Sequence, residues 1–373
     1  MSDSFGSAIK VTIFGESHGM GVGAVIDGLA AGIEIDSEFM RAQMEKRRAK
    51  GAISTQRHEK DEVRFLSGVY NGHTTGTALC LMIENNNTKS EDYAKTEKLL
   101  RPGHADYTAE VKYGGFADAR GGGHFSGRLT APIVAAGSIF TQLLSKNGVS
   151  IATHIAQCAG INDDAFSADA SILQGQIAAL NSADFAVLNS EKKEEMQNAI
   201  KKAAQDGDSV GGILETVITG VQAGIGEPFF GSVESVLSAL LFSIPAVKGV
   251  EFGAGFAFAD MQGSKANDAF CIENGKIATK TNNNGGINGG IANGMPIILR
   301  TVIKPTPSIY KEQDTVDFAN MENAKITING RHDPCILHRA RAVQDAMCAF
   351  GLADLYSVCF SKAWQGEQKW NTD

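Results

Sequence analysis

The sequence predicts an α+β fold in which helices are layered with largely antiparallel sheets. Segments with strand character and segments with helical periodicity do not alternate in the regular rhythm of a doubly wound βαβ sheet. The chain has 373 residues, of which 43% are hydrophobic, so it can bury a large core. We expect a single composite domain over residues 1–373, with two closely packed lobes as the alternative.

Strands are predicted where β-branched and aromatic residues cluster between turn residues. The predicted strands cover 10–14, 22–26, 62–66, 78–83, 212–219, 250–258 and 296–303. A hairpin is predicted at 270–279, because Asn274 and Gly275 tolerate the positive φ of a type I′ turn.

Helices are predicted from apolar residues at helical spacing and from capping residues. Asp36 or Ser37 can cap the first helix, and Asn189 or Ser190 can cap the third. The predicted helices cover 37–49, 129–146, 190–205 and 335–351.

Composition excludes several classes of protein. A net charge of −8 argues against general affinity for nucleic acid or acidic membranes. The sequence contains no apolar run long enough for a transmembrane helix and no pattern of a signal peptide. The six cysteines are scattered without the close spacing of disulfide scaffolds or zinc ribbons. We therefore expect a cytoplasmic protein with reduced thiols and no metal site.

Familiar cofactor and nucleophile motifs are missing. The sequence has neither a P-loop nor the strand–GxGxxG–helix unit of a dinucleotide fold. It also has no HExxH metal motif and no GxSxG elbow. These gaps disfavour ATP-driven enzymes, common dehydrogenases and serine hydrolases.

The arginines suggest an anionic ligand. All 12 lie between Arg41 and Arg128 or between Arg300 and Arg341, whereas lysines occur throughout. A guanidinium group binds phosphate or carboxylate with two parallel hydrogen bonds. Ordinary surface charge is the alternative.

Two motifs place a histidine in a glycine-containing turn. In segment 15–19 (GESHG), His18 can bind phosphate as a cation or transfer a proton, or it can be a histidine satisfied within the turn. In segment 101–107 (RPGHADY), His104 can be oriented by a carboxylate such as Asp106. Alternatively, Asp106 caps a short helix.

Three further segments favour ligand binding. Segment 120–128 (RGGGHFSGR) runs into a helix, so its bare amides and the helix dipole can bind an anion, unless it is a glycine-rich turn without a ligand. Segment 281–294, followed by 304–308 (KPTPS), can approach a planar ligand closely or form a flexible surface loop. In segment 331–334 (RHDP), Asp333 can serve the site or cap the next helix.

The order of these motifs resembles the chorismate synthase family. The motifs that carry the resemblance are GESHG, RPGHADY, RGGGHFSGR, IPAVKGVEFG, the glycine-rich segment with KPTPS, and GRHDPC. They extend from about Phe5 to Cys335 and so cover most of the chain.

The resemblance implies a β-α-β sandwich, with two antiparallel sheets around a helical core, assembled as a homotetramer. It implies conversion of 5-enolpyruvylshikimate 3-phosphate to chorismate and phosphate by an overall 1,4-anti elimination. The reaction would need reduced FMN without net redox change, and we expect an external flavin-reducing system to supply it. The substrate's two carboxylates and phosphate give the arginines anions to bind.

The resemblance also assigns residues to roles. His18 would stabilise the leaving phosphate, His104 would lie near the flavin and donate a proton to it or keep it in the right ionisation state, and Asp333 would act with flavin N5 as base towards the C6 proton. The implied substrate-binding residues are Arg47, Arg48, Arg101, Ser126, Arg128 and Arg331. The implied FMN-binding residues are His124, Phe125, Ser126, Pro245, Ala246, Gly289, Lys304, Pro305, Thr306, Pro307, Ser308 and Arg331, and Arg47 is also implied in NADP binding.

Three departures from the family pattern stand out. The loop after Arg47 and Arg48 is shorter, and His124 and Phe125 replace a common Arg–Ser pair. The usual R-A-x-P run after Cys335 is altered, which we expect to change only helix geometry. Two rival functions are a flavoenzyme that performs a net oxidation or reduction with NAD(P)H and a catalytically silent anion-binding or structural protein.

Overall fold

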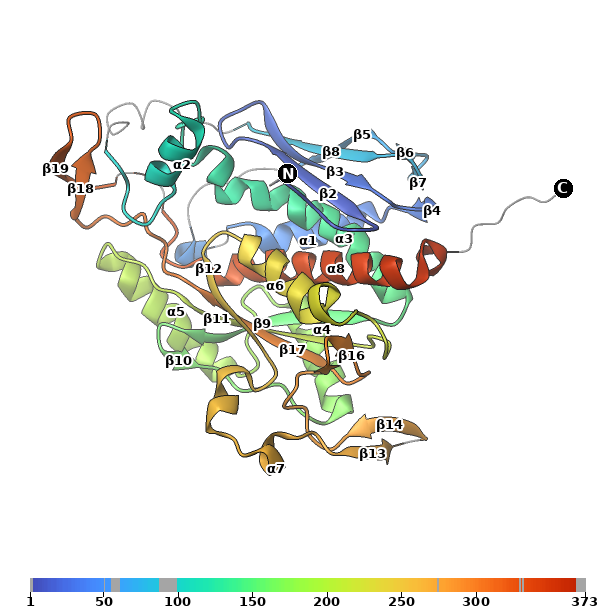
Figure 1. The fold of residues 1–373 in the computed structure, drawn as a ribbon. Coiled ribbons are helices and arrows are strands. Elements are labelled where there is room, and N and C mark those ends of the chain that lie inside the picture. Colours follow the sequence, from blue (N-terminus) through green and yellow to red (C-terminus); the bar gives the residue numbers. More distant parts are fainter. Residues whose placement is uncertain are drawn as a thin grey trace.

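Two antiparallel sheets enclose a layer of helices in the computed structural model, which describes residues 3–49, 51–54, 61–86, 99–273, 275–328, 330 and 332–366 (Figure 1). The first sheet has the order β1 (Ser4–Phe5), β2 (Lys10–Gly15), β3 (Gly21–Asp27), β8 (Leu79–Glu84) and β5 (Val63–Ser67). The second has the order β10 (Ile161–Asn162), β9 (Ser150–Cys158), β11 (Gly212–Thr219), β17 (Ile297–Ile303) and β12 (Val247–Phe252). The α+β prediction is confirmed.

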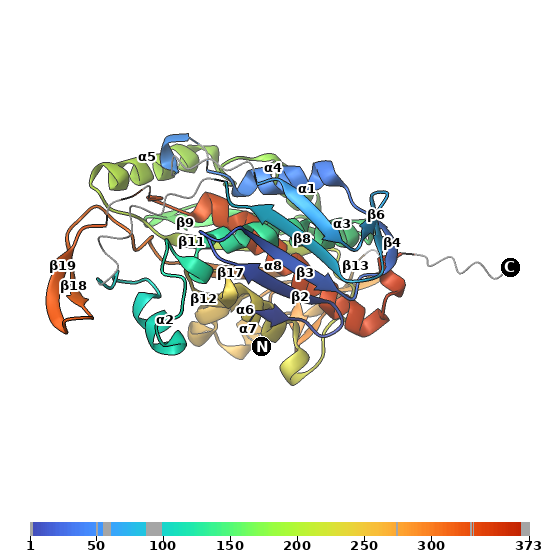
Figure 2. The same ribbon diagram turned by 90° about the horizontal axis from the view of Figure 1, so that it is seen from above.

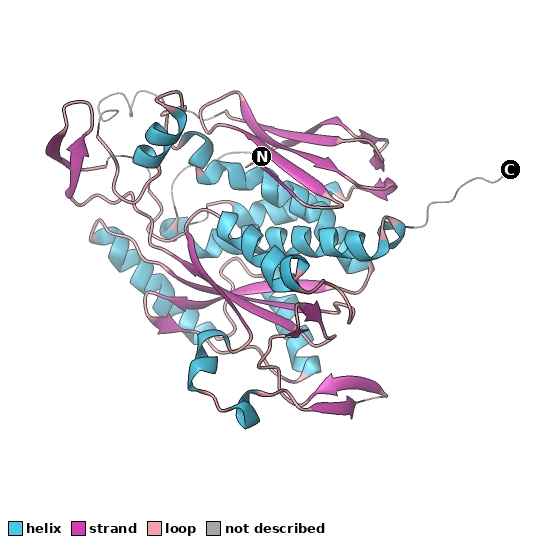
Figure 3. Cartoon of the chain, in the orientation of Figure 1, coloured by secondary structure: helices cyan, strands magenta, loops and turns pink. Residues whose placement is uncertain are grey.

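The helical layer lies between the sheets, as Figure 3 shows by colour, and Figure 2 shows the first sheet crossing above α3 and α8. The described helices are α1 (Ser37–Arg47), α2 (Asp106–Tyr113), α3 (Thr130–Lys146), α4 (Ala170–Ser182), α5 (Ser190–Gln205), α6 (Val233–Ser243), α7 (Gly263–Ala266) and α8 (Leu337–Phe360). The layer between the sheets consists of α1, α3, α6 and α8 (Figure 1). Most of α8 is buried, because helices and sheet residues cover it on all sides. One continuous core contains apolar residues of both sheets, α3, α6 and α8.

Smaller sheets decorate this sandwich. They are β4 (Ala31–Glu34) with β7 (His73–Thr75) and β6 (Val69–Tyr70), β13 (Phe270–Glu273) with β14 (Lys276–Thr279), β15 (Ile287–Asn288) with β16 (Ile291–Ala292), and β18 (Gln313–Asp317) with β19 (Glu322–Ile326). The predicted hairpin at 270–279 is confirmed, with Gly275 at φ +76°, while Asn274 lies outside the described residues.

Side-chain caps form at the start of two helices, as the sequence predicts. The Asp36 carboxylate accepts hydrogen bonds from the amides of Glu38 and Phe39, 3.0 and 2.8 Å away. The Asn189 side chain accepts one from the amide of Glu191 at 3.0 Å. These bonds satisfy amides that have no partner within the first helical turn, so α1 and α5 begin where the sequence predicts.

Two predicted boundaries are wrong, and a glycine explains each. The strand predicted at 250–258 ends at Phe252, because Gly253 (φ +56°) approaches the backbone nitrogen of Gly285 so closely that an added Cβ would lie 2.5 Å from it. The helix predicted to end at Gly351 continues to Phe360. Gly351 instead allows α6 to approach α8, since an added Cβ would lie 2.7 Å from Leu237 Cδ2.

No helix in the described part of the chain is both long and apolar enough to cross a membrane.

Candidate active site

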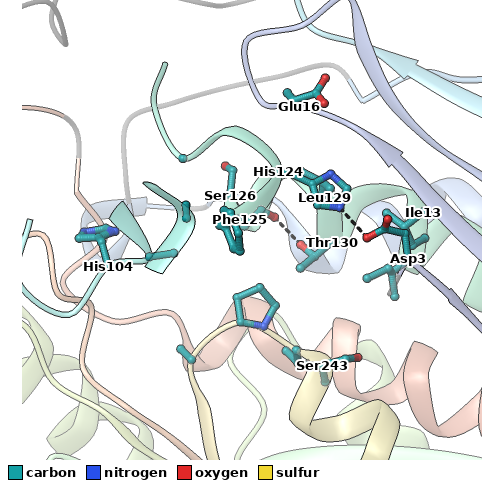
Figure 4. Close-up of a pocket in the computed structure, with 18 of the residues that line it drawn as sticks. Asp3, Ile13, Glu16, His104, His124, Phe125, Ser126, Leu129, Thr130 and Ser243 are labelled. Carbon is teal, nitrogen blue, oxygen red and sulfur yellow. Dashed lines mark hydrogen bonds and ion pairs between the residues drawn. The ribbon is translucent and has the colours of Figure 1, made fainter. Parts of the chain in front are cut away.

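A cavity of about 1580 Å³ lies between the glycine-rich turn before α3 and the chain that follows α6. Figure 4 shows Phe125 and Ser126 at the middle of its wall, with His104 towards one end and Asp3 and Ile13 towards the other. Predicted site residues from distant segments meet on this wall. They are Arg101, His104, His124, Phe125, Ser126, Pro245, Ala246, Lys304, Thr306, Pro307 and Asp333.

His104 is held in the cavity wall as a neutral imidazole. Its Nε2 lies 2.7 Å from the hydroxyl of Ser308. Burial, followed by the positive charge of Arg101, lowers the pKa of His104 to about 4. At neutral pH the ring therefore offers hydrogen bonds without a net charge.

Asp106 binds Arg101, and it neither orients His104 nor caps α2. Its carboxylate accepts hydrogen bonds from the Arg101 amide, Nε and Nη2 at 2.9, 2.8 and 2.6 Å. Burial alone would raise the pKa of Asp106, but these bonds and the charge of Arg101 outweigh burial and lower it. The partner that orients His104 is Ser308, and the N-cap of α2 is Ala105, which makes no side-chain capping bond.

The glycine-rich turn before α3 forms two short 3-10 turns, Gly123–Phe125 and Gly127–Leu129. The Ser126 hydroxyl accepts a hydrogen bond from the Arg128 amide at 3.2 Å. His124 is tied to the chain behind the turn: its Nδ1 donates to the Gly15 carbonyl at 2.8 Å, and its Nε2 lies 3.2 Å from Asp3 Oδ1 (Figure 4).

His18 lies behind this turn rather than on the described wall of the cavity. The side chain is 9% exposed, and its Nδ1 is 3.1 Å from the Ser17 hydroxyl. An added Cβ on Gly121 (φ +66°) would lie 2.7 Å from that same Nδ1. Gly121 is therefore the residue that lets the imidazole pack directly beneath the loop.

Arg47 and Arg128 converge on a buried carboxylate, Asp61. Arg47 Nη1 lies 3.1 Å from Asp61 Oδ2, and Arg128 Nη1 contacts Asp61 Oδ1. The exposed fractions of the three side chains are 7%, 4% and 2% for Arg47, Arg128 and Asp61. Neither arginine is among the described residues that line the cavity, and Arg48 pairs with Glu45 at the end of α1.

The predicted cofactor segment at 304–308 lies partly on the wall. Lys304 Nζ donates to the Gly103 carbonyl at 2.7 Å, and Pro307 packs against Gly103. Thr306 Oγ1 is buried and has no hydrogen-bond partner among the described residues. Pro305 and Ser308 are not among the described lining residues.

Of two further predicted contacts, Ala246 lines the cavity and Gly289 does not. Ala246 lines the cavity with φ +76°, a left-handed conformation that is costly for a residue with a Cβ. Gly289 lies in the turn of the β15–β16 hairpin and is not among the described lining residues. Arg331 is outside the described residues.

Asp333 lines the cavity and does not cap α8. The N-cap position of α8 is Ile336, and it makes no side-chain capping bond. The Asp333 carboxylate instead pairs with Arg339, whose Nη1 lies 2.6 Å from Oδ2.

Comparison with known proteins identifies the family. The chorismate synthase family profile matches residues 9–357. The chorismate synthase of Thermococcus gammatolerans is 44% identical over 361 residues, which cover 97% of this chain and 99% of that protein. That of Archaeoglobus fulgidus is 45% identical over 353 residues, covering 94% of this chain and 96% of that protein. The chain belongs to the chorismate synthase family.

A crystal structure of chorismate synthase agrees in fold, with a TM-score of 0.75, 27% identity and coverage of 96% of this chain and 94% of that chain. Membership of the chorismate synthase family makes the chain a carbon–oxygen lyase. The resemblance predicted from the motifs is thereby confirmed.

Sequence reasoning missed two residues that hold predicted site residues in place, Asp61 and Arg339. Asp61 looks like an ordinary surface carboxylate before a strand, and only its burial against two arginines reveals it. Arg339 stands in the altered run after Cys335, six positions beyond Asp333. That spacing is the one signal that could have linked the two residues, because one turn of helix and a short extended segment can bring them together.

Proposed function

We propose that this enzyme converts 5-enolpyruvylshikimate 3-phosphate to chorismate and phosphate by 1,4-anti elimination, with reduced FMN and no net redox change. The observation that carries the proposal is the single cavity wall on which His104, Ser126, Lys304 and Asp333 meet. These residues come from four separate segments of the chain. Family membership gives the reaction class, and the wall supplies donors, a carboxylate and room for two ligands.

The wall fits a flavin mononucleotide. Thr306 Oγ1, buried without a described partner, is a donor and acceptor that a bound ligand can satisfy. The strained backbone at Ala246 and the bare backbone of the glycine-rich turn allow close approach of a planar group. When bound, reduced FMN supplies electron density that weakens the C–O bond to the leaving phosphate.

The protein's own groups divide the remaining work. Asp333, on the wall as a carboxylate, is the proposed acceptor of the C6 proton. His18, beneath the glycine-rich turn, is the proposed cation that stabilises the departing phosphate. His104 contributes a neutral hydrogen-bonding ring beside the cofactor, because its pKa is lowered to about 4.

We propose Arg101 and Ser126 as direct contacts of the substrate, because both line the cavity. Arg48 and the undescribed Arg331 complete the proposed anion site, and we propose that Arg47 and Arg128, which bind Asp61, serve it by holding the turn that carries Ser126. Burial of Arg47 against Asp61 does not favour an NADP contact there, so we propose that FMN is reduced by an external system. The single composite domain and the cytoplasmic location remain predictions from length and composition, and the homotetramer remains a prediction of the family resemblance.

The decisive experiment is anaerobic incubation of the enzyme with dithionite-reduced FMN and 5-enolpyruvylshikimate 3-phosphate. Chorismate absorbance and phosphate should rise in equal amounts, and no flavin should be consumed. A flavoenzyme with net redox chemistry would consume reductant in step with product. A silent anion-binding protein would release no phosphate, and either result would overturn the proposal.

A further inference from the structure

We infer that Arg339 is a positioning residue, which fixes the Asp333 carboxylate and ties it to the end of α1 that carries Arg47 and Arg48. The inference rests on the proposed function, since it takes Asp333 as the base. Arg339 itself is not among the described residues that line the cavity. It therefore acts through Asp333 and not on the substrate.

The guanidinium group of Arg339 bridges two segments that are far apart in the sequence. Its Nη1 lies 2.6 Å from Asp333 Oδ2, and its Nε donates to the main-chain carbonyl of Arg47 at 2.9 Å. The side chains of Arg339 and Asp333 are 21% and 15% exposed, so solvent screens the ion pair only partly. A planar group with donors pointing in two directions can make both bonds at once, which a lysine ammonium at the end of a flexible chain does less well.

Asp333 needs such a partner because it precedes the regular part of α8. The helix begins at Leu337, so the backbone of Asp333 lies outside the regular hydrogen bonds of α8. The neighbouring Pro334 carbonyl accepts a hydrogen bond from the Val210 amide at 2.9 Å, which holds the backbone beside Asp333. Buried Cys335 anchors the chain on the other side. The pair with Arg339 is made by the carboxylate itself, so it acts directly on the group that the proposed function uses as base.

The second bond of Arg339 gives the base a link to the proposed anion site. The Arg47 side chain bonds Thr130 Oγ1 at 2.8 Å and the Gly127 carbonyl at 2.9 Å, so it joins α1 to the start of α3. Arg339 attaches Asp333 to the backbone of that same residue. The position of the base therefore depends on the end of α1 and on the turn that holds Ser126.

A double-mutant cycle in turnover tests the inference. Arg339→Gln should lower kcat by about 10- to 100-fold, the effect of misplacing a catalytic group by about 1 Å, while KM changes by less than about 3-fold. Arg339→Lys should recover part of the loss, because it keeps the charge. The double variant Asp333→Asn/Arg339→Gln should be no slower than Asp333→Asn alone. If the two losses multiply, Arg339 does not act through Asp333 and the inference fails.

A matched control comes from the same helix. Arg341 is buried and donates to the carbonyls of Leu180 and Ala183, away from the cavity. Arg341→Lys should lower the thermal unfolding temperature but leave kcat within about 2-fold of the parent. An equal loss of kcat in this variant would show general disturbance of α8, which would overturn the positioning role.

Thermal unfolding without substrate separates this inference from the proposed function. The parent, Asp333→Asn, Arg339→Gln and the double variant should show coupling in unfolding temperature. The double variant should lose less than the sum of the two single losses. If the parent enzyme makes no chorismate but this coupling is present, the proposed function fails and the pairing stands. Additive losses in unfolding temperature would reject the pairing whatever the turnover shows.

Discussion

At the scale of single residues, Asp61 shows how burial decides the meaning of a charge. One carboxylate, 2% exposed, meets the guanidinium groups of both Arg47 and Arg128. Removing one partner from a buried ion pair is far more costly than removing one from an exposed pair, because the remaining charge stays out of water. Asp61 thus joins α1 to the turn before α3.

Asp61→Asn is therefore expected to destabilise the protein by about 3–5 kcal/mol in chemical denaturation. The matched control is Arg64→Gln, which breaks the exposed pair with Glu84, in which the two side chains are 56% and 37% exposed. That change should cost less than about 1 kcal/mol. Equal effects of the two substitutions would contradict the role given to Asp61.

His104 gives the second prediction at this scale. His104→Ala should lower kcat by about 100-fold or more, the effect of removing one positioned hydrogen-bond donor from an active site, while FMN affinity changes little. Ser308→Ala removes the hydroxyl 2.7 Å from His104 Nε2 and should give a smaller loss in the same direction. Anaerobic turnover and flavin fluorescence titration measure the two effects, and normal turnover of His104→Ala would refute the role.

At the scale of elements, periodicity and capping predicted the helices α1, α3, α5 and α8 and most strands of the two main sheets, whereas close packing could not be foreseen. Gly351 looks like a helix end in the sequence but is a contact point between α8 and α6. The strand β9 was missed, as were α4 and α6, although each carries apolar residues. Short apolar runs fit a strand or a buried helix equally well, so the neighbours decide.

Gly137 on α3 is another such contact, and it gives the prediction for elements. Alanine normally stabilises a helix over glycine by about 1 kcal/mol. An added Cβ at Gly137, however, would lie 2.6 Å from Ala346 Cα on α8, so Gly137→Ala should force α3 and α8 apart and lower stability by about 1–3 kcal/mol. Gly175→Ala on α4, with nothing within 4 Å of the new Cβ, should raise stability by about 0.5–1 kcal/mol. Urea denaturation checks both, and the same sign for the two substitutions would contradict the packing argument.

At the scale of the whole molecule, the sequence predicted which segments gather at the cavity better than which side chains face it. His104, Ser126, Lys304 and Asp333 do line the wall. Arg47 and Arg128 instead turn to Asp61, and that choice depends on a carboxylate whose burial the sequence does not reveal. The family resemblance implied the role of each arginine, but tertiary packing sets the direction in which its side chain points.

The buried histidines predict how stability of the whole molecule depends on pH. Burial, followed by the charge of Arg101, lowers the pKa of His104 to about 4. Burial, followed by the charge of Arg339, lowers the pKa of His338 to about 4 as well. In the unfolded chain these groups titrate near pH 6.5. Between about pH 6.5 and 4 the unfolded chain therefore binds more protons than the folded protein. Stability should fall as the solution is acidified, by up to about 1.4 kcal/mol per pH unit for each proton.

His154 works in the opposite direction. Burial alone would lower its pKa, but hydrogen bonds with Asp163 and Glu215, at 2.8 and 3.0 Å, outweigh burial and raise it. The stabilisation that His154 gives to the folded protein is complete below about pH 6.5. It is lost as the pH rises through the pKa of His154 in the folded protein. Stability should consequently be greatest near neutral pH and decline on both sides.

Urea denaturation at pH 7, 6 and 5 measures the acid side of this profile. The parent protein should lose stability steadily as the pH falls. In His338→Gln the change of unfolding free energy with pH should be smaller, by up to the contribution of one proton. Removing the ring from its contact with Ser54 should also lower stability at every pH. His104→Gln should flatten the slope in the same way and serves as the test if the first variant does not fold. Equal stability of the parent at pH 7 and pH 5 would mean that the two imidazoles accept protons in the folded protein, which their burial within the core and the cavity wall opposes.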